Sequence, residues 1–102
     1  MFLLVSNVPA SASASIAQSL VEEKRAACVT ETPVKSTYEW EGKILRDEEV
    51  TLTIKVSSEA IDDTRDRLLE LHPYEVPEVL AIPVDVQHSH GPYVEWVNGQ
   101  CS

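Results

Sequence analysis

The chain has 102 residues, of which 43% are hydrophobic and 25% are charged, a composition typical of one small globular domain. Its 17 acidic residues outnumber the 8 basic ones and give a formal net charge of −9, which argues against nucleic-acid phosphates or anionic lipid as partners. No apolar stretch approaches the roughly 20 residues that span a membrane, so we expect a cytoplasmic protein whose two cysteines stay reduced.

The chain opens with a short apolar run at residues 2–8, which ends at Pro9. Its strongly apolar part, Phe2 to Val5, is shorter than the roughly 7–15 residues of a signal-peptide core and has no basic residue before it. A buried central strand is therefore the expected element. A helix follows, with possible N-caps among Ser11 to Ser15 and an apolar stripe from Ile16 to Ala27.

Two extended segments follow the first helix. Apolar and polar residues alternate from 34 to 40 and from 50 to 56, which predicts two strands with one buried face each. Glu41-Gly42 predicts a tight hairpin turn between them, because glycine tolerates a positive φ. Pro33 lacks a backbone donor and indicates a bend, a bulge or a sheet edge. The charged run 46–49 predicts a bulge or a change of strand partner.

The second half of the chain repeats the helix–strand pattern. A second helix can begin at Ser57–Ser58 and must end before His72-Pro73, because the residue before a proline avoids the helical region. Residues 76–84 are nearly continuously apolar and predict a strand. Gly91-Pro92 opens a short final helix, which Gly99 can end.

The element order, β-α-β-β-α-β with a C-terminal helix, predicts a single α+β domain over residues 1–102. This order is that of the ferredoxin-like fold, an antiparallel sheet with two helices on one face. A hairpin strand over residues 44–56 would be about 43 Å long, whereas a domain of this size is only about 34 Å across. The hairpin must bend or overhang. An overhanging apolar hairpin needs cover from another chain, so we expect self-association.

Five segments of the chain closely resemble the CutA family. They are residues 23–29 (EKRAACV), 38–44 (YEWEGKI), 48–50 (EEV), 72–78 (HPYEVPE) and 93–97 (YVEWV). The resemblance covers nearly the whole chain in the same order. It implies a ferredoxin-like homotrimer and a role in tolerance of divalent cations, copper especially, without an established catalytic activity. Some relatives carry a cysteine where this chain has Ser6 or Asn7, which puts a thiolate-rich copper site in doubt here.

Four residues are candidate ligands for a weakly bound Cu(II) or another divalent cation, because thiolates and imidazoles suit copper and zinc. They are Cys28, His72, His88 and His90. Each also has a purely structural interpretation: Cys28 as a small core residue, His72 as a charge at a helix end, and the His88/His90 pair as a solvated loop.

A second hypothesis is a small-molecule sensor. Trimeric ferredoxin-like proteins such as the PII signalling family bind ligands in clefts between subunits, which is an analogy of fold. Aromatic residues beside lysines could bind a small anionic ligand, or the lysines could pair with Glu39 or Glu41. The candidate ligand-binding residues are Trp40, Lys43, Lys55, Tyr74 and Glu78.

Motifs for catalysis and cofactor binding are absent from the sequence. The chain has no phosphate-binding loop, no dinucleotide fingerprint, no nucleophile elbow and no zinc-binding spacing. We therefore do not expect an enzyme.

Overall fold

The structure, a computed structural model, describes residues 1–101. Its elements follow the order expected from the sequence. They are β1 (Phe2–Val8), α1 (Ala10–Glu22), β2 (Cys28–Trp40), β3 (Lys43–Val56), α2 (Ile61–Leu71), β4 (Leu80–Pro83) and α3 (Gly91–Gln100). None of the helices within residues 1–101 is both long and apolar enough to cross a membrane.

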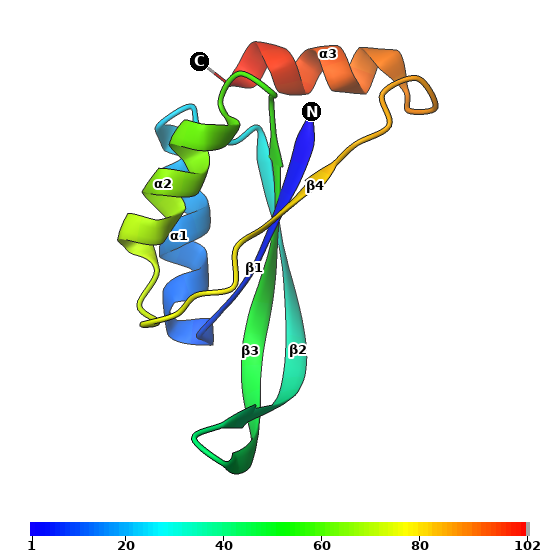
Figure 1. The fold of residues 1–102 in the computed structure, drawn as a ribbon. Coiled ribbons are helices and arrows are strands. Elements are labelled where there is room, and N and C mark those ends of the chain that lie inside the picture. Colours follow the sequence, from blue (N-terminus) through cyan, green and yellow to red (C-terminus); the bar gives the residue numbers. More distant parts are fainter. Residues whose placement is uncertain (102) are drawn as a thin grey trace.

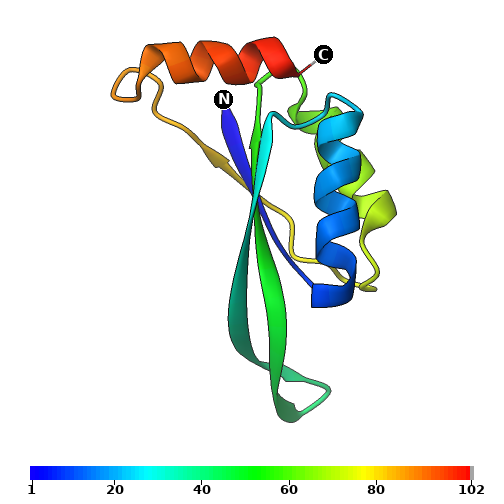
Figure 2. The same cartoon turned by 180° about the vertical axis from the view of Figure 1, so that it is seen from behind.

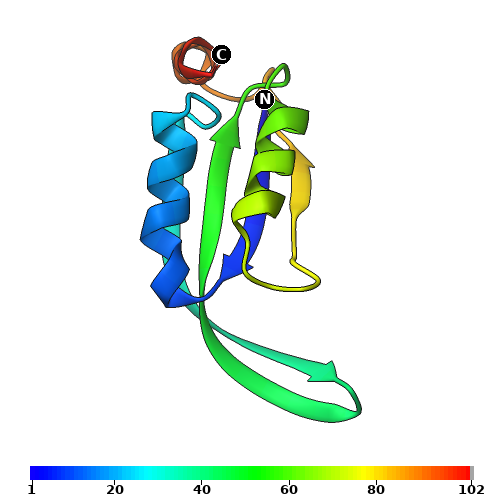
Figure 3. The same cartoon turned by 90° about the vertical axis from the view of Figure 1, so that its left-hand side faces the viewer.

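The four strands form one antiparallel sheet in the order β2-β3-β1-β4. Helices α1 and α2 lie side by side on one face of this sheet (Figure 1 and Figure 3). Helix α3 crosses one end of the molecule, and the β2–β3 hairpin extends from the other end (Figure 2). This arrangement is the ferredoxin-like α+β fold that the element order predicts.

The core lies between the sheet and the two helices. In β1 and β3, every second residue points toward the helices, as the period of a strand requires. Each fully buried large apolar side chain contributes about 1.5–3 kcal/mol relative to exposure. The most deeply buried of them are Leu4, Val8, Leu20, Leu52, Ile54, Val56 and Leu68, each at 1% exposure or less.

The β2–β3 hairpin is longer than the sheet that supports it. Its ladder runs without interruption from Cys28–Lys55 to Trp40–Lys43, whereas β1 pairs with β3 only as far as Val8–Val50. The outer half of the hairpin therefore has no third strand beside it, and it curves away below the helices (Figure 3). The molecule measures 45 × 27 × 21 Å as a result.

The local signals in the hairpin have clear outcomes. Glu41 and Gly42 both have positive φ, 52° and 78°, as a two-residue hairpin turn requires. Pro33 lies in β2, an edge strand of the sheet. The expected bulge at 46–49 is absent, because these residues keep their register with β2. The alternative, a change of partner, is correct, since this run begins where the pairing with β1 ends.

Several predicted boundaries were wrong. The last strand covers only Leu80–Pro83 instead of 76–84, because Pro77 has no backbone donor and the preceding residues cross the end of the sheet as a loop. Helix α2 begins at Ile61, since Ser57 accepts a bond from the Ala60 N–H and closes a turn ahead of it.

The outer helices differ from expectation in smaller ways. Helix α1 begins directly after Pro9 and has no side-chain cap. Helix α3 continues through Gly99 and ends at Gln100. Its start agrees with prediction, because Pro92 stands in its first turn, where a missing N–H costs nothing.

Candidate functional site

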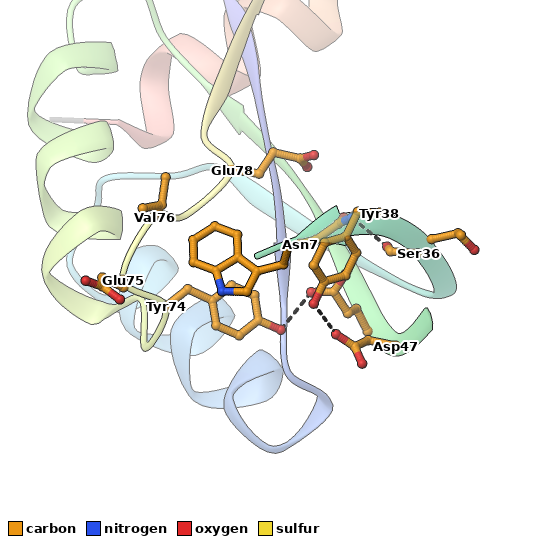
Figure 4. A pocket seen from close by; sticks show the side chains of 11 residues that line it. Asn7, Ser36, Tyr38, Asp47, Tyr74, Glu75, Val76 and Glu78 are labelled. Carbon is orange, nitrogen blue, oxygen red and sulfur yellow. Dashed lines mark hydrogen bonds between the residues drawn. The ribbon is translucent and has the colours of Figure 1, made fainter. Parts of the chain in front are cut away.

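A cavity of about 680 Å³ lies between the β2–β3 hairpin and the loop that follows α2 (Figure 4). We call it the hairpin cavity. This volume is in the usual range for small-molecule sites. Its walls are formed by Asn7 of β1, by Ser36, Thr37, Tyr38 and Trp40 of β2, by Asp47 and Glu49 of β3, and by Tyr74, Glu75, Val76 and Glu78 of the loop.

Strand alternation brings the hairpin residues of the cavity onto one face. Ser36 and Asp47 are direct partners in the β2–β3 ladder, and Tyr38 and Glu49 lie two residues from them on the same side. The Tyr38 hydroxyl donates a hydrogen bond to the Asp47 carboxylate. The Asn7 amide adds a link to β1, because it donates to the Ser36 hydroxyl over 3.3 Å.

Glu49 is the most buried acidic residue of the cavity, with 8% of its surface exposed. The Tyr74 hydroxyl donates to its Oε2 over 2.7 Å, which joins the loop to β3 (Figure 4). Burial, together with the nearby Glu49 carboxylate, raises the pKa of Tyr74. The phenol therefore stays protonated at neutral pH and remains a donor to Glu49.

His72 fixes the start of the loop. Its Nδ1 accepts a bond from the Tyr74 N–H over 3.2 Å, and its Nε2 lies 3.0 Å from the Asn7 carbonyl oxygen. These bonds require a neutral ring that carries its proton on Nε2. Burial lowers the pKa of His72 below its ordinary value of 6.5, which favours the same neutral form.

The predicted metal ligands occupy separate parts of the fold. Both nitrogens of His72 are engaged in the hydrogen bonds just described. Cys28 starts β2 and is half-buried, with the Lys55 Nζ 3.7 Å from its Sγ. His88 is exposed, and its Nδ1 lies 2.7 Å from Asp85 Oδ2. His90 is exposed and directly precedes α3.

These four residues therefore do not converge within one subunit. Across residues 1–101, no set of three or more histidine, cysteine, aspartate or glutamate side chains is arranged to hold a metal ion. The assignment of Cys28, His72, His88 and His90 as ligands stays a prediction, and within this fold it requires groups from more than one subunit.

The predicted ligand-binding residues divide into two groups. Trp40, Tyr74 and Glu78 all line the hairpin cavity, although 34 residues or more separate Trp40 from the other two. Lys43 stands at the hairpin turn, and Lys55 lies near the far end of β3, where its Nζ donates to Thr30. The cavity thus gathers the predicted aromatic and acidic residues without the predicted lysines.

The sequence reasoning missed Tyr38, Asp47 and Glu49 as cavity residues. A usable signal was present in the hairpin turn. With Glu41-Gly42 as the two-residue loop, the register is fixed, and counting back from it pairs Ser36 with Asp47. The same count places Tyr38 and Glu49 on that face as well.

Comparison with known proteins agrees with the fold and identifies the family. The model of the CutA1 divalent ion tolerance protein family matches residues 2–100. The divalent-cation tolerance protein CutA of Thermus thermophilus is 38% identical over 84 residues, which cover 81% of this chain and 80% of that protein. Human protein CutA is 45% identical over 83 residues, 80% of this chain. That match spans only 45% of the human protein's length.

Solved structures resemble this fold over its full length. The apo form of the PII-like protein CutA from Nostoc sp. PCC 7120 has a TM-score of 0.98 at 41% identity and covers 100% of this chain and 98% of its own. The Thermus thermophilus divalent cation tolerance protein has a TM-score of 0.90 at 33% identity, with both chains fully covered. The chain therefore belongs to the CutA1 divalent ion tolerance protein family.

Proposed function

We propose that this protein is a homotrimer that contributes to tolerance of divalent cations, copper among them, and that it binds metal weakly and is not an enzyme. The name of the Thermus thermophilus relative supports the role in cation tolerance. The structural support is the distribution of exposed apolar residues, which indicates that the subunit works as part of an assembly.

Large apolar side chains are exposed where the fold has no second layer. Trp40 and Ile44 stand on the overhanging hairpin, with Ile44 72% exposed. Leu80 and Ile82 lie on β4, the edge strand at the other side of the sheet, and are both exposed. Exposed apolar strands at open edges promote pairing with other chains. A closed ring of subunits covers such edges without leading to open-ended growth.

Light scattering tests the assembly. We expect a particle of about 34 kDa, three times the subunit mass of 11.3 kDa. Ile44→Lys should shift the population toward smaller particles, because it places a charge on the exposed hairpin. Val21→Lys is the matched control, since Val21 is exposed on α1, away from the hairpin. A particle near 11 kDa at micromolar concentration contradicts the proposal.

Isothermal titration with Cu(II) and Zn(II) tests the metal ligands. The combined variant Cys28→Ser, His72→Gln, His88→Ala and His90→Ala should lose most of the weak binding. Cys101→Ser serves as a control that removes a thiol outside the proposed set. An unchanged affinity in the folded combined variant would exclude all four residues as ligands.

A second candidate function is that of a sensor that binds a small organic molecule. The hairpin cavity favours it, because it brings Trp40, Tyr74 and Glu78 together in a space large enough for such a molecule. A thermal-shift screen of metabolites separates the two functions. Stabilisation by an organic compound supports the sensor, whereas stabilisation by metal ions alone favours the first proposal.

A further inference from the structure

The charge of the hairpin cavity has one sign. Four carboxylates line it, those of Asp47, Glu49, Glu75 and Glu78. Among the residues that the structure describes, no lysine or arginine lines it. The nearest basic residues of the hairpin alternate to its other face, as Lys35 does opposite Glu48. An anionic ligand would therefore meet only repulsion in this cavity.

Glu49 lacks a positive partner despite its burial. More than nine-tenths of its surface is covered, and its hydrogen-bond donor is the neutral hydroxyl of Tyr74. Within residues 1–101, Glu49 forms no ion pair with a lysine, arginine or histidine. A carboxylate in this position is costly unless a cation compensates it. The remaining carboxylate oxygen can accept a further donor.

The spacing of these acidic groups excludes a single metal ion as their common partner within one subunit. No three of the described carboxylates converge closely enough to hold one. They are instead distributed around a space of about 680 Å³. A polyatomic cation several atoms long can reach carboxylates on opposite walls, which a bare ion cannot.

Aromatic side chains complete the chemistry of the cavity. Tyr38, Trp40 and Tyr74 line it from the hairpin and the loop. The face of an aromatic ring attracts a cation, tryptophan most strongly, and the attraction grows when water is excluded. Aromatic rings combined with carboxylates are the usual surroundings of bound ammonium and guanidinium groups.

We propose that the hairpin cavity binds a small organic cation, an amine or guanidinium compound, through Glu49 and Asp47 with Trp40 and Tyr74 packed against it. The proposal rests on the second candidate function and defines its ligand class. It also revises the expectation of an anionic ligand, because Lys43 and Lys55 lie away from the cavity. The charged group replaces the missing partner of Glu49.

Calorimetric titration of the intact protein with agmatine in phosphate buffer tests this proposal. Agmatine carries a guanidinium and an amine on a four-carbon chain. We expect saturable binding at one molecule per subunit and a higher melting temperature. Choline tests the aromatic contribution alone, because it carries a charge without N–H donors. Succinate, an anion of similar length, should not bind.

Two variants and one control locate the site. Glu49→Gln should weaken agmatine binding about tenfold or more, because a charge-assisted bond is lost. Asp47→Asn, at a more exposed position, keeps the test valid if Glu49→Gln does not fold. Glu48→Gln is the matched control: it removes the same charge from the next residue, which faces away, and should change the affinity less than twofold.

Three results would overturn the proposal: no agmatine binding at millimolar concentration, equal binding of succinate, or an agmatine affinity that both cavity variants leave unchanged. If agmatine fails and Glu49→Gln instead reduces the particle mass, a basic side chain of a second copy occupies the cavity. These outcomes are independent of the Cu(II) titration and of the metabolite screen, in which another class of compound can still support a sensor.

Discussion

At the scale of single residues, buried polar groups that are joined to a partner differ from those that are not. His72 ties the loop after α2 to β1 through both ring nitrogens. Ser13 donates to Glu31 across the α1–β2 contact over 2.5 Å. Ser6, on the helix-facing side of β1, is fully buried, and its hydroxyl has no partner within the described chain. Each case leads to a different response to substitution.

The folded protein should lose stability in acid through His72. Burial holds its pKa below 6.5, so the unfolded chain binds the proton more readily. The contribution of His72 is therefore complete above pH 6.5 and is lost as the pH falls through the lower pKa of the folded state. Glu49, the nearby acidic group, opposes this by favouring the charged ring, but burial dominates.

Urea unfolding at pH 7.5 and pH 5 measures this effect at one protein concentration. The free energy of unfolding should fall more steeply toward acid in the wild type than in His72→Gln, which cannot titrate. His90→Gln, exposed before α3, should follow the wild-type profile. Parallel profiles for the wild type and His72→Gln would show that the neutral ring does not contribute.

Ser6 and Ser13 provide a matched pair of buried hydroxyls. Ser6→Ala should leave the free energy of unfolding unchanged or raise it by up to about 1 kcal/mol, because a buried hydroxyl without a partner is removed. Ser13→Ala should lower it by about 1 kcal/mol, because the bond to Glu31 is lost. Equal destabilisation by both substitutions in urea unfolding would indicate that Ser6 has a partner in the assembled protein.

At the scale of elements, the hairpin depends on its two-residue turn and on continuous pairing. Glu41 and Gly42 take left-handed backbone conformations, which suit the twist of the two strands. Beyond Val50, β3 has only β2 as a neighbour. The turn therefore sets the register of a segment that no third strand corrects.

Replacing two glycines by alanine should have opposite effects. Gly42→Ala should cost about 1–2 kcal/mol, because φ is 78° there and an added Cβ strains the backbone even though space is open. Gly99→Ala should stabilise α3 by up to about 1 kcal/mol, because alanine loses less backbone entropy in a helix. Thermal unfolding of the two variants measures both signs, and a neutral Gly42→Ala would show that the turn does not hold the hairpin.

At the scale of the whole molecule, the subunit buries its apolar residues on one face of the sheet only. Twelve large apolar residues remain exposed, among them Ile44, Leu80 and Ile82. A chain of about 100 residues has little core to spare. Much of the stability of the protein should then come from contacts between subunits.

The melting temperature should accordingly depend on protein concentration. If the folded subunits are held in trimers, mass action favours the folded state at higher concentration. We expect the melting temperature to rise between 1 and about 100 μM protein in reversible scans, and Val21→Lys to keep this dependence. A melting temperature that is constant over this range would show that subunits unfold without dissociating or are stable alone.

The sequence predicted most of the fold because its strongest signals were local. Alternation over 34–40 and 50–56 identified the hairpin strands, and Pro73 placed the end of α2. The extent of β4 was not predictable from apolar character, since Val76 is apolar and yet 72% exposed in the loop. Its position is set by Pro77 and by the hydrogen bonds of His72, which depend on tertiary contacts.

The candidate site was predictable only in part, for a related reason. Trp40, Tyr74 and Glu78 were grouped correctly, whereas Asp47 and Glu49 were treated as part of a charged interruption. In the structure this run continues the alternation, with every second residue facing the cavity. Charge alone does not reveal which face of a strand a residue occupies; the register does.

The unequal ladders of β3 have a consequence for how assembly can be followed. Inward from Val50 the strand has a neighbour on each side, but beyond it only on one. In a free subunit, amide protons of β3 that point away from β2 in the outer hairpin, between Lys43 and Glu49, should exchange with solvent deuterium quickly. Slow exchange there would report contact with another chain, so this short stretch serves as a built-in gauge of association.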